Sequence, residues 1–135
     1  MTYKPIPGGI TAPNGFRAAG LASGVKLSGK PDLALIYSET EAAAAGVFTK
    51  NSVVAAPVAF SKHNLGGGKA RAIIVNSGNA NACTGTQGYA DAVVMAEVTA
   101  HTLGLCADAV VVASTGVIGV PQREEKIEKG SNAIA

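Results

Sequence analysis

Two short polar stretches, each directly after an apolar run, hold the residues whose types could do chemistry. The stretch 114–116 (Ser-Thr-Gly) follows the apolar residues 109–113, and the polar run 76–85 follows the apolar residues 72–75. Neither polar stretch contains a carboxylate, an imidazole or a lysine, so neither suits proton transfer as a general acid or base. Hydroxyls, amides and backbone N–H groups instead suit a site that binds a neutral or transiently negative oxygen.

Thr115 and Gly116 are the candidate catalytic residues. A glycine directly after a strand lets the backbone turn so that its N–H faces outward, and a neighbouring threonine hydroxyl can supply a second donor. Two converging donors are the minimum for an oxyanion hole. Local sequence alone favours the alternative, an ordinary strand-to-loop turn in which Thr115 caps a backbone group. Phosphate binding is disfavoured, because Ala70 follows Lys69 where a P-loop requires Ser or Thr.

A strand–helix–strand unit would bring the two polar stretches together. The apolar runs 72–75 and 109–113 predict strands, and apolar residues at spacings of three and four predict a helix from Thr86 to Leu103. Such a unit makes the two strands parallel, so their carboxyl ends lie at one edge of the sheet and the polar stretches line one site. Because both strands are apolar throughout, we expect the sheet to be covered on both faces.

The rest of the chain predicts further strands and one more helix. Strands are expected at 33–37, at 46–49 and at 53–60, the last at an edge or a bulge because it contains Pro57. Short strands are also expected within 16–26, and a helix is expected to begin within 123–129. The pattern is that of an α/β protein, and 135 residues suit a single domain with one core.

The composition excludes several classes of partner. The sequence is 47% hydrophobic and 15% charged, with a net charge of +2, and its lysines and arginines form no cluster. A nucleic-acid-binding surface is therefore not expected. No apolar run approaches the roughly 18 residues of a membrane-spanning helix, and the first residues lack the apolar core of a signal peptide. We therefore expect no membrane partner and a cytoplasmic location.

The cysteines and histidines offer only weak signals of a site. Cys83 and Cys106 do not form a CxxC pair, and we expect both to be small buried hydrophobic residues. The alternative is a nucleophilic role for Cys83, which lies beside the asparagine-rich run. His63 and His101 have no ligand-like spacing with each other or with the cysteines, so no metal site is expected.

Six stretches of the sequence resemble the N-terminal half of the ornithine acetyltransferase family, the bifunctional glutamate N-acetyltransferases of arginine biosynthesis. The resemblance covers nearly the whole chain, and its two longest motifs contain the polar stretches described above. The six stretches are GGITAPNGFRAAG (8–20), KPDLALI (30–36), AAGVFTKN (44–51), AAPV (55–58), ARAIIVNSGNANACTGTQG (70–88) and VASTGVIGVP (112–121).

The resemblance implies a specific reaction. Members of the family are made as a precursor that cleaves itself between an Ala and a Thr, giving an α chain and a β chain. The new N-terminal Thr of the β chain takes the acetyl group of N-acetylornithine and passes it to glutamate. The family's oxyanion hole is the Thr-Gly of an STG motif, which corresponds to Thr115 and Gly116. The run from Asn76 to Asn81 is characteristic of the family, and we interpret it as structural lining.

The resemblance also implies that this sequence holds only part of an enzyme. The family's nucleophile is absent, so we expect a single partial domain over 1–135, an α-chain segment without its C-terminal part, that is inactive alone. The fold implied is the layered α/β sheet-and-helix fold of self-processing N-terminal-nucleophile proteins, incomplete in this chain. The implied partners are the β chain, in a heterotetramer of two α and two β chains, and the substrates N-acetylornithine and glutamate.

No cofactor is implied, although some members of the family accept acetyl-CoA as the acetyl donor. Two alternatives stay open at this point. In the first, the chain is half of a related self-processing, aminopeptidase-like hydrolase. In the second, it is a non-catalytic fragment or binding module in which the STG turn has only a packing role.

Overall fold

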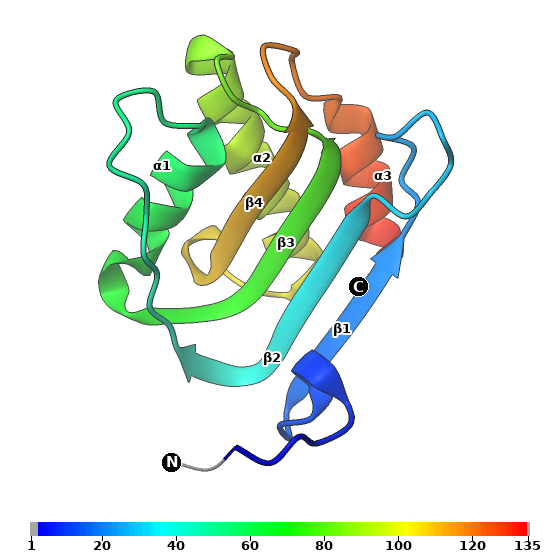
Figure 1. Ribbon diagram of the computed structural model, residues 1–135, viewed down its shortest axis with the longest axis vertical. Coiled ribbons are helices and arrows are strands. Elements are labelled where there is room, and N and C mark those ends of the chain that lie inside the picture. The colour runs from blue at the N-terminus through cyan, green and yellow to red at the C-terminus, as the bar shows by residue number, and fades with distance from the viewer. Residues whose placement is uncertain (1–2, 135) are drawn as a thin grey trace.

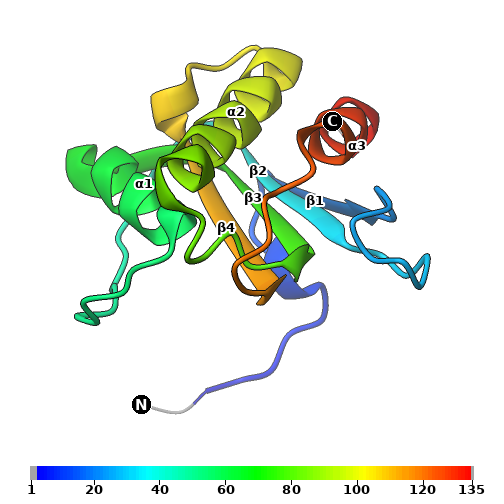
Figure 2. The same ribbon diagram turned by 90° about the horizontal axis from the view of Figure 1, so that it is seen from above.

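A four-stranded sheet with helices on one of its faces makes up the structure, which is a computed structural model describing residues 3–134 (Figures 1 and 2). The strands are β1 (Phe16–Leu21), β2 (Leu33–Ala43), β3 (Lys69–Asn79) and β4 (Val110–Val117). The α-helices are α1 (Ala56–Asn64), α2 (Gly85–Leu103) and α3 (Glu124–Ile134). Short 3-10 turns occupy Gly9–Thr11, Leu65–Gly67 and Ala107–Ala109.

The strands follow one another across the sheet in the order β1-β2-β3-β4. The pairs β1–β2 and β2–β3 are antiparallel, whereas β3 and β4 are parallel and are joined through α2. The predicted strand–helix–strand unit is therefore confirmed, and the α/β class with it. Figure 1 shows the carboxyl ends of β3 and β4 side by side at one edge of the sheet.

The core lies between the sheet and the three helices, and the two-residue period of the strands selects its side chains. In β3, Ala72 and Ile74 are buried, whereas Ile73 between them is 37% exposed. Helix α2 presents small residues to the sheet, which allows close packing. The buried apolar residues are Leu33, Leu35, Phe60, Ala72, Ile74, Ala92, Met95, Ala96, Ala100, Val110, Val112 and Ile127.

The expectation of a sheet covered on both faces is wrong for the described residues. All three helices pack on the same side of the sheet, as Figure 2 shows. On the other side, the strands and the segment after β2 border a hollow of about 440 Å³, whose lining is mainly apolar. Among its lining residues are Phe16, Ile36, Phe48, Leu65, Ile73 and Val111. The apolar side chains of this open face therefore lack a covering layer.

Two of the predicted strands are wrong. Residues 46–49 form no regular element, and Val47 lies fully in solvent, because the segment after β2 has left the sheet. Residues 53–60, which are apolar throughout, lead into α1 instead of forming a strand. Pro57 lies in the first turn of that helix, where its missing N–H leaves no bond unmade. Packing of α1 on the sheet favours the helix, since Phe60 and Ser61 of α1 are buried there.

The other predicted elements are present with different ends. The strand predicted at 33–37 runs to Ala43, and only residues 16–21 of the region 16–26 are a strand. The helix predicted from Thr86 to Leu103 is confirmed as α2, and that predicted near 123–129 is confirmed as α3. Helix α2 connects β3 to β4, and α3 packs on α2. No helix among the described residues is long and apolar enough to cross a membrane.

The outer edge of β4 is capped by side chains of α1. The Ser61 hydroxyl donates to the Val112 carbonyl over 2.7 Å and accepts from the Val112 N–H over 2.9 Å. The Asn64 amide donates to the carbonyls of Ala107 and Val110, both over 2.9 Å. These bonds satisfy backbone groups that would otherwise be unpaired at a sheet edge. They end at Val112, so the edge beyond that residue has no such cap from α1.

Asp32 fixes the loop between β1 and β2 against the end of the sheet. It is 3% exposed, and its carboxylate accepts from the Ser23 N–H, the Ser23 hydroxyl and the Lys26 N–H over 2.6 to 2.9 Å. The Asp32 carbonyl accepts from Ser77 N–H of β3 over 2.8 Å. Burial raises the pKa of the Asp32 carboxyl, but the hydrogen bonds from Lys26 and Ser23 outweigh it and leave the pKa below its ordinary value.

We predict that Ser61→Ala lowers the free energy of unfolding by about 1–3 kcal/mol, because the buried N–H and carbonyl of Val112 both lose their partner. Urea denaturation of the chain measures this. The exposed Ser52, for which no side-chain hydrogen bond is found, is the matched control, and Ser52→Ala is expected to leave the midpoint unchanged. Equal midpoints for the two variants would show that the cap at Val112 does not stabilise the edge.

We predict that Asp32 makes stability depend on acid. A carboxyl whose pKa is lowered by folding stabilises the protein above its unfolded pKa of about 3.9, and this contribution is lost as the pH falls through the folded pKa. Asp32→Asn is therefore expected to destabilise at pH 7 and to flatten the fall in unfolding free energy below about pH 4. Asp108→Asn, at an exposed position, is the control. Unfolding curves that fall equally with acid in the wild type and Asp32→Asn would contradict this role.

Candidate active site

The two polar stretches meet where β3 and β4 end, as the sequence predicts, but they lie within the strands. The register pairs Asn76 with Ser114, Ser77 with Thr115 and Gly78 with Gly116. The expectation of two loops is thus corrected: β3 continues to Asn79 and β4 continues through the STG sequence to Val117. Each strand closes with a hydroxyl residue followed by a glycine, so the two ends are alike in chemistry and lie side by side.

Gly116 allows the backbone of β4 to approach the end of β3 more closely than a residue with a side chain would. Gly116 has a φ of +135° and Gly78 a φ of +117°, a region that residues with a side chain rarely adopt. A Cβ on Gly116 would lie 2.3 Å from the carbonyl carbon of Gly78 and 2.6 Å from the N of Asn79. The ladder is irregular at this point, since Asn79 pairs with both Thr115 and Val117. Glycine is therefore a steric requirement of the site.

Thr115 and Gly116 are exposed, so the bend is not sealed inside the protein. The outer edge of β4 is identified by the Val112 N–H, which faces Ser61 of α1. The two-residue period of a strand directs the N–H of Ser114 and Gly116 to that same outer edge. Five hollows of about 330 to 440 Å³ on the described surface are lined by other residues.

A set of asparagines shapes the backbone around the two glycines. Asn76 is fully buried and donates to the carbonyl of Asn79 over 2.9 Å. Asn79 accepts from Asn81 N–H over 2.7 Å and donates to the carbonyls of Val120 and Pro121 over 2.9 and 3.1 Å. The interpretation of this run as structural lining is therefore too general. Its side chains tie the end of β3 to the segment that leaves β4.

Asn81 anchors the turn into α2. It is fully buried with a φ of +46°, and its amide donates to the Gly88 carbonyl over 2.7 Å. The Thr84 hydroxyl donates to the side-chain oxygen Oδ1 of Asn81 over 2.8 Å. A Cβ on Gly88 would lie 1.9 Å from that hydroxyl oxygen, so the first turn of the helix needs glycine to sit on this loop.

A buried polar layer lies beneath the strand ends. The side-chain amide of Gln122, which is 8% exposed, donates to the side-chain oxygen Oδ1 of Asn76 over 3.4 Å, and the backbone N–H of Gln122 donates to the Asp91 carboxylate over 3.3 Å. The hydroxyl of Ser114 and the side-chain oxygen of Gln122 have no partner among the described residues. A hydrogen bond with Asp91, followed by burial and the negative charges of Asp91 and Glu128, raises the pKa of Glu124 at the start of α3.

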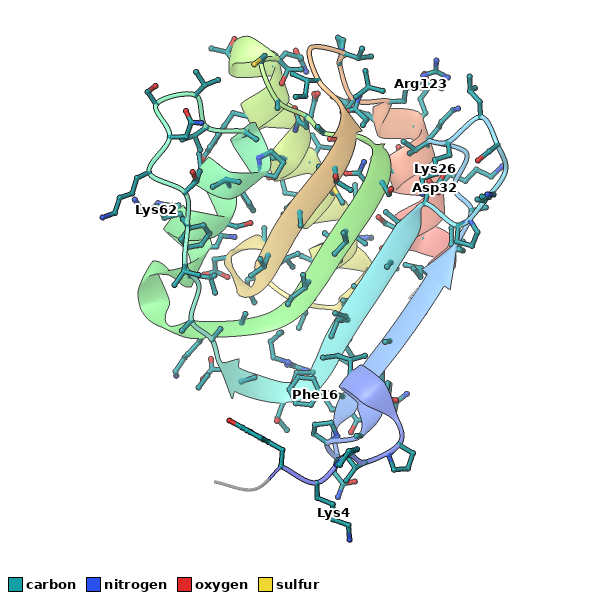
Figure 3. All side chains as sticks on the ribbon, viewed as in Figure 1. Lys4, Phe16, Lys26, Asp32, Lys62 and Arg123 are labelled. Atoms are coloured by element: carbon teal, nitrogen blue, oxygen red, sulfur yellow. The ribbon has the colours of Figure 1, made fainter. Side chains whose placement is uncertain are left out.

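The loop held by Asp32 packs on the same strand end. A Cβ on Gly78 would lie 3.0 Å from Lys26 Cγ and 3.1 Å from Val25 Cγ1. Figure 3 shows Lys26 and Asp32 at the edge of the sheet where β3 and β4 finish. The Lys26 ammonium donates to the Pro31 carbonyl over 3.3 Å, and no carboxylate among the described residues forms an ion pair with it.

The other candidates from the sequence lie outside this group. The prediction of buried cysteines is wrong, because Cys83 and Cys106 are both exposed. Cys83 lines a different hollow, together with Ser52, Val54 and Tyr89 among others. His63 and His101 are exposed on α1 and α2. The described residues contain no group of three or more His, Cys, Asp or Glu side chains that could hold a metal ion.

Sequence reasoning missed Gly78 and the loop around Lys26. A signal for Gly78 was present, because Ser77-Gly78 stands at the end of its strand as Thr115-Gly116 does at the end of the next. In a parallel pair, two such dipeptides meet in register. No signal in the sequence placed Lys26 on Gly78, since that contact depends on how Asp32 folds the loop. The candidate site thus comprises the exposed Thr115 and Gly116 beside Gly78, with the buried asparagines around them.

The comparisons with known proteins identify the family of the chain. The model of the ArgJ family matches residues 17–135. The "Arginine biosynthesis bifunctional protein ArgJ" of Gloeobacter violaceus is 60% identical over 98% of this chain and 33% of its own length. The Synechocystis protein of the same name is 52% identical over 95% of this chain and 31% of its own length. The chain therefore spans about a third of the length of these curated relatives.

Two solved structures share the fold. The ornithine acetyltransferase of Mycobacterium tuberculosis, crystallised in complex with ornithine, matches with a TM-score of 0.91 and 48% identity, covering 93% of this chain and 68% of that one. The ArgJ protein of Bacillus halodurans matches with a TM-score of 0.89 and 42% identity, covering 93% of this chain and 65% of that one. With a family match over most of its length and relatives this similar, the chain belongs to the ArgJ family.

Proposed function

We propose that this chain supplies the oxyanion hole of an enzyme that transfers the acetyl group of N-acetylornithine to glutamate. The observation that carries the proposal is the bend at Thr115–Gly116, which is exposed and held in a conformation that only glycine allows. The family to which the chain belongs supports the reaction, since its relatives are named for arginine biosynthesis and ornithine acetyltransfer. The absence of proton-transfer groups from the strand ends fits a role limited to stabilising charge.

The chemistry assigns one role to each donor. The hydroxyl oxygen of a nucleophilic threonine bonds to the acetyl carbonyl carbon while its proton passes to a free N-terminal amine. The carbonyl electron pair moves onto oxygen, and that oxyanion accepts hydrogen bonds from the Gly116 N–H and the Thr115 hydroxyl. Collapse of the intermediate expels the amine of ornithine, which takes up the proton, and leaves an acetyl ester on threonine. The amine of glutamate then attacks this ester through the same kind of oxyanion. Collapse breaks the ester C–O bond, the threonine oxygen takes up the proton that the amine loses, and N-acetylglutamate is released.

The nucleophile belongs, in this proposal, to a β chain cut from the same precursor. The open face of the sheet supports such a partner, because apolar side chains such as Ile36, Ile73 and Val111 border an uncovered hollow. The chain's match to only a third of its relatives' length leaves ample sequence for a covering layer. We place the partner there, in an assembly of two α and two β chains located in the cytoplasm. The reaction needs no cofactor, and the same two donors would serve acetyl-CoA as an alternative acetyl donor.

The direct test joins the chain to the part of the Gloeobacter violaceus relative that lies outside the matched region, which gives a reconstituted enzyme. Acetyl transfer from N-acetylornithine to glutamate is then measured by the appearance of N-acetylglutamate. Transfer that requires glutamate supports the proposal. Release of acetate without an acceptor would favour a hydrolase instead, and a folded protein with neither activity would favour a binding module.

We predict that Thr115→Ala lowers kcat of the reconstituted enzyme roughly 100- to 1,000-fold, the usual loss for one oxyanion donor. Thr115→Ser keeps the hydroxyl and is expected to retain most of the activity. Steady-state kinetics of the two variants provide the comparison. If Thr115→Ala turned over as fast as the wild type, the hydroxyl of Thr115 would have no part in the reaction.

We predict that Gly116→Ala destabilises the chain by about 3 kcal/mol or more, because the added methyl meets the backbone of Gly78 and Asn79. Gly119 is the matched control, since it also has a positive φ but a Cβ there would meet nothing within 4 Å. Gly119→Ala is expected to cost only the strain of a left-handed residue, about 1–2 kcal/mol. Urea denaturation measures both, and equal losses would mean that the contact with Gly78 is not tight.

A further inference from the structure

We propose that Asn79 is the positioning residue of the oxyanion hole. The inference rests on the proposed function and extends it to a side chain that touches no substrate in that reaction. Asn79 is the last residue of β3, and it is 6% exposed. Its side chain connects the strand end to the segment that leaves Gly116, and its backbone lies against Gly116 itself.

The side chain of Asn79 uses all of its hydrogen-bonding groups on the two segments around the site. Its oxygen accepts from Asn81 N–H over 2.7 Å, on the way to α2. Its amide group donates to the carbonyls of Val120 and Pro121, over 2.9 and 3.1 Å, on the way from β4 to α3. One amide therefore holds together two chain segments that are about forty residues apart in sequence.

The backbone of Asn79 supports the bend from behind. A Cβ on Gly116 would lie 2.6 Å from its N, and its carbonyl is held by the amide of Asn76 over 2.9 Å. Next to it, Ala80 N–H donates to the Val117 carbonyl over 2.9 Å. Movement of Asn79 would therefore move the surface on which Gly116 rests.

Apolar packing does not hold the segment after Gly116. Val117, Ile118 and Val120 are 57%, 64% and 45% exposed, so little buried surface fixes them in the described structure. The bonds from Asn79 take that role, together with the Gly119 N–H, which donates to the Ala82 carbonyl over 2.8 Å. Asparagine is suited to it because its amide offers both an acceptor and two donors, whereas aspartate would place a negative charge against two carbonyls.

Position is what an oxyanion hole needs, because its donors act only if they are already directed at the developing charge. A displacement of about 1 Å at a reacting group can slow a reaction by up to about 100-fold. Asn79→Ala in the reconstituted enzyme is therefore expected to lower kcat roughly 10- to 100-fold while KM stays within about twofold.

Asn64 provides a matched control at the other end of β4. Its amide also donates to two carbonyls, that of Val110 at the start of β4 and that of Ala107 in the turn before it, so Asn64→Ala removes the same kind of bonds. Both variants are expected to lose stability in urea, but only Asn79→Ala is expected to lose kcat. Asn79→Asp removes the donors without leaving a cavity, and it serves as the second probe if Asn79→Ala gives little folded protein. Rates are expressed per folded molecule, counted by circular dichroism.

A double-variant cycle separates positioning from general loosening. If Asn79 acts through the oxyanion hole, then Asn79→Ala slows an enzyme that already carries Thr115→Ala by much less than it slows the wild type. A full, multiplicative loss in that background would overturn the inference, as would a change in KM alone or an equal kcat loss in Asn64→Ala. A different result would contradict the proposed function itself, namely unchanged turnover in the single variant Thr115→Ala.

Discussion

The contact between the backbones of Gly78 and Gly116 is the constraint on which the candidate site depends. Any side chain at Gly116 would overlap the carbonyl carbon of Gly78, so the closeness of β3 and β4 at their ends requires glycine at position 116. The register is irregular directly after this contact, since Asn79 faces both Thr115 and Val117. Thr115 and Gly116 are exposed at this end of the sheet.

Polar side chains, more than apolar packing, hold this bend. Away from the site, the sheet and helices are joined by small apolar residues, as expected for a chain with few charges. Close to the site, the buried side chains of Asn76, Asn79 and Asn81 join the segments instead, because each donates a hydrogen bond to a backbone carbonyl. Hydrogen bonds have direction, so they fix where a carbonyl or N–H points in a way that apolar contacts do not. The site gains rigidity from groups that carry no charge and do not compete for a developing oxyanion.

The one-sided cover of the sheet is the second general feature. The three helices and the core occupy one face, while the other face borders a mainly apolar hollow. The open face and the exposed edge of β4 beyond Val112 adjoin each other, because both belong to the same strand. A partner layer that covered the face would therefore also approach Thr115 and Gly116. The proposed division of labour, with donors on this chain and the nucleophile elsewhere, follows that geometry.

The sequence by itself determined the strand–helix–strand unit and brought Thr115 and Gly116 to the same edge as Asn76. Apolar runs and helical spacing are local patterns, and the parallel pairing they imply leaves little choice of where the strands end. Tertiary structure alone decided that 53–60 leads into a helix, because a short apolar run suits either a strand or a helix until Phe60 and Ser61 pack on the sheet. It also decided that Gly78 opposes Gly116 and that Asn79 reaches Pro121, since contacts between distant segments depend on register and packing, which no local pattern encodes.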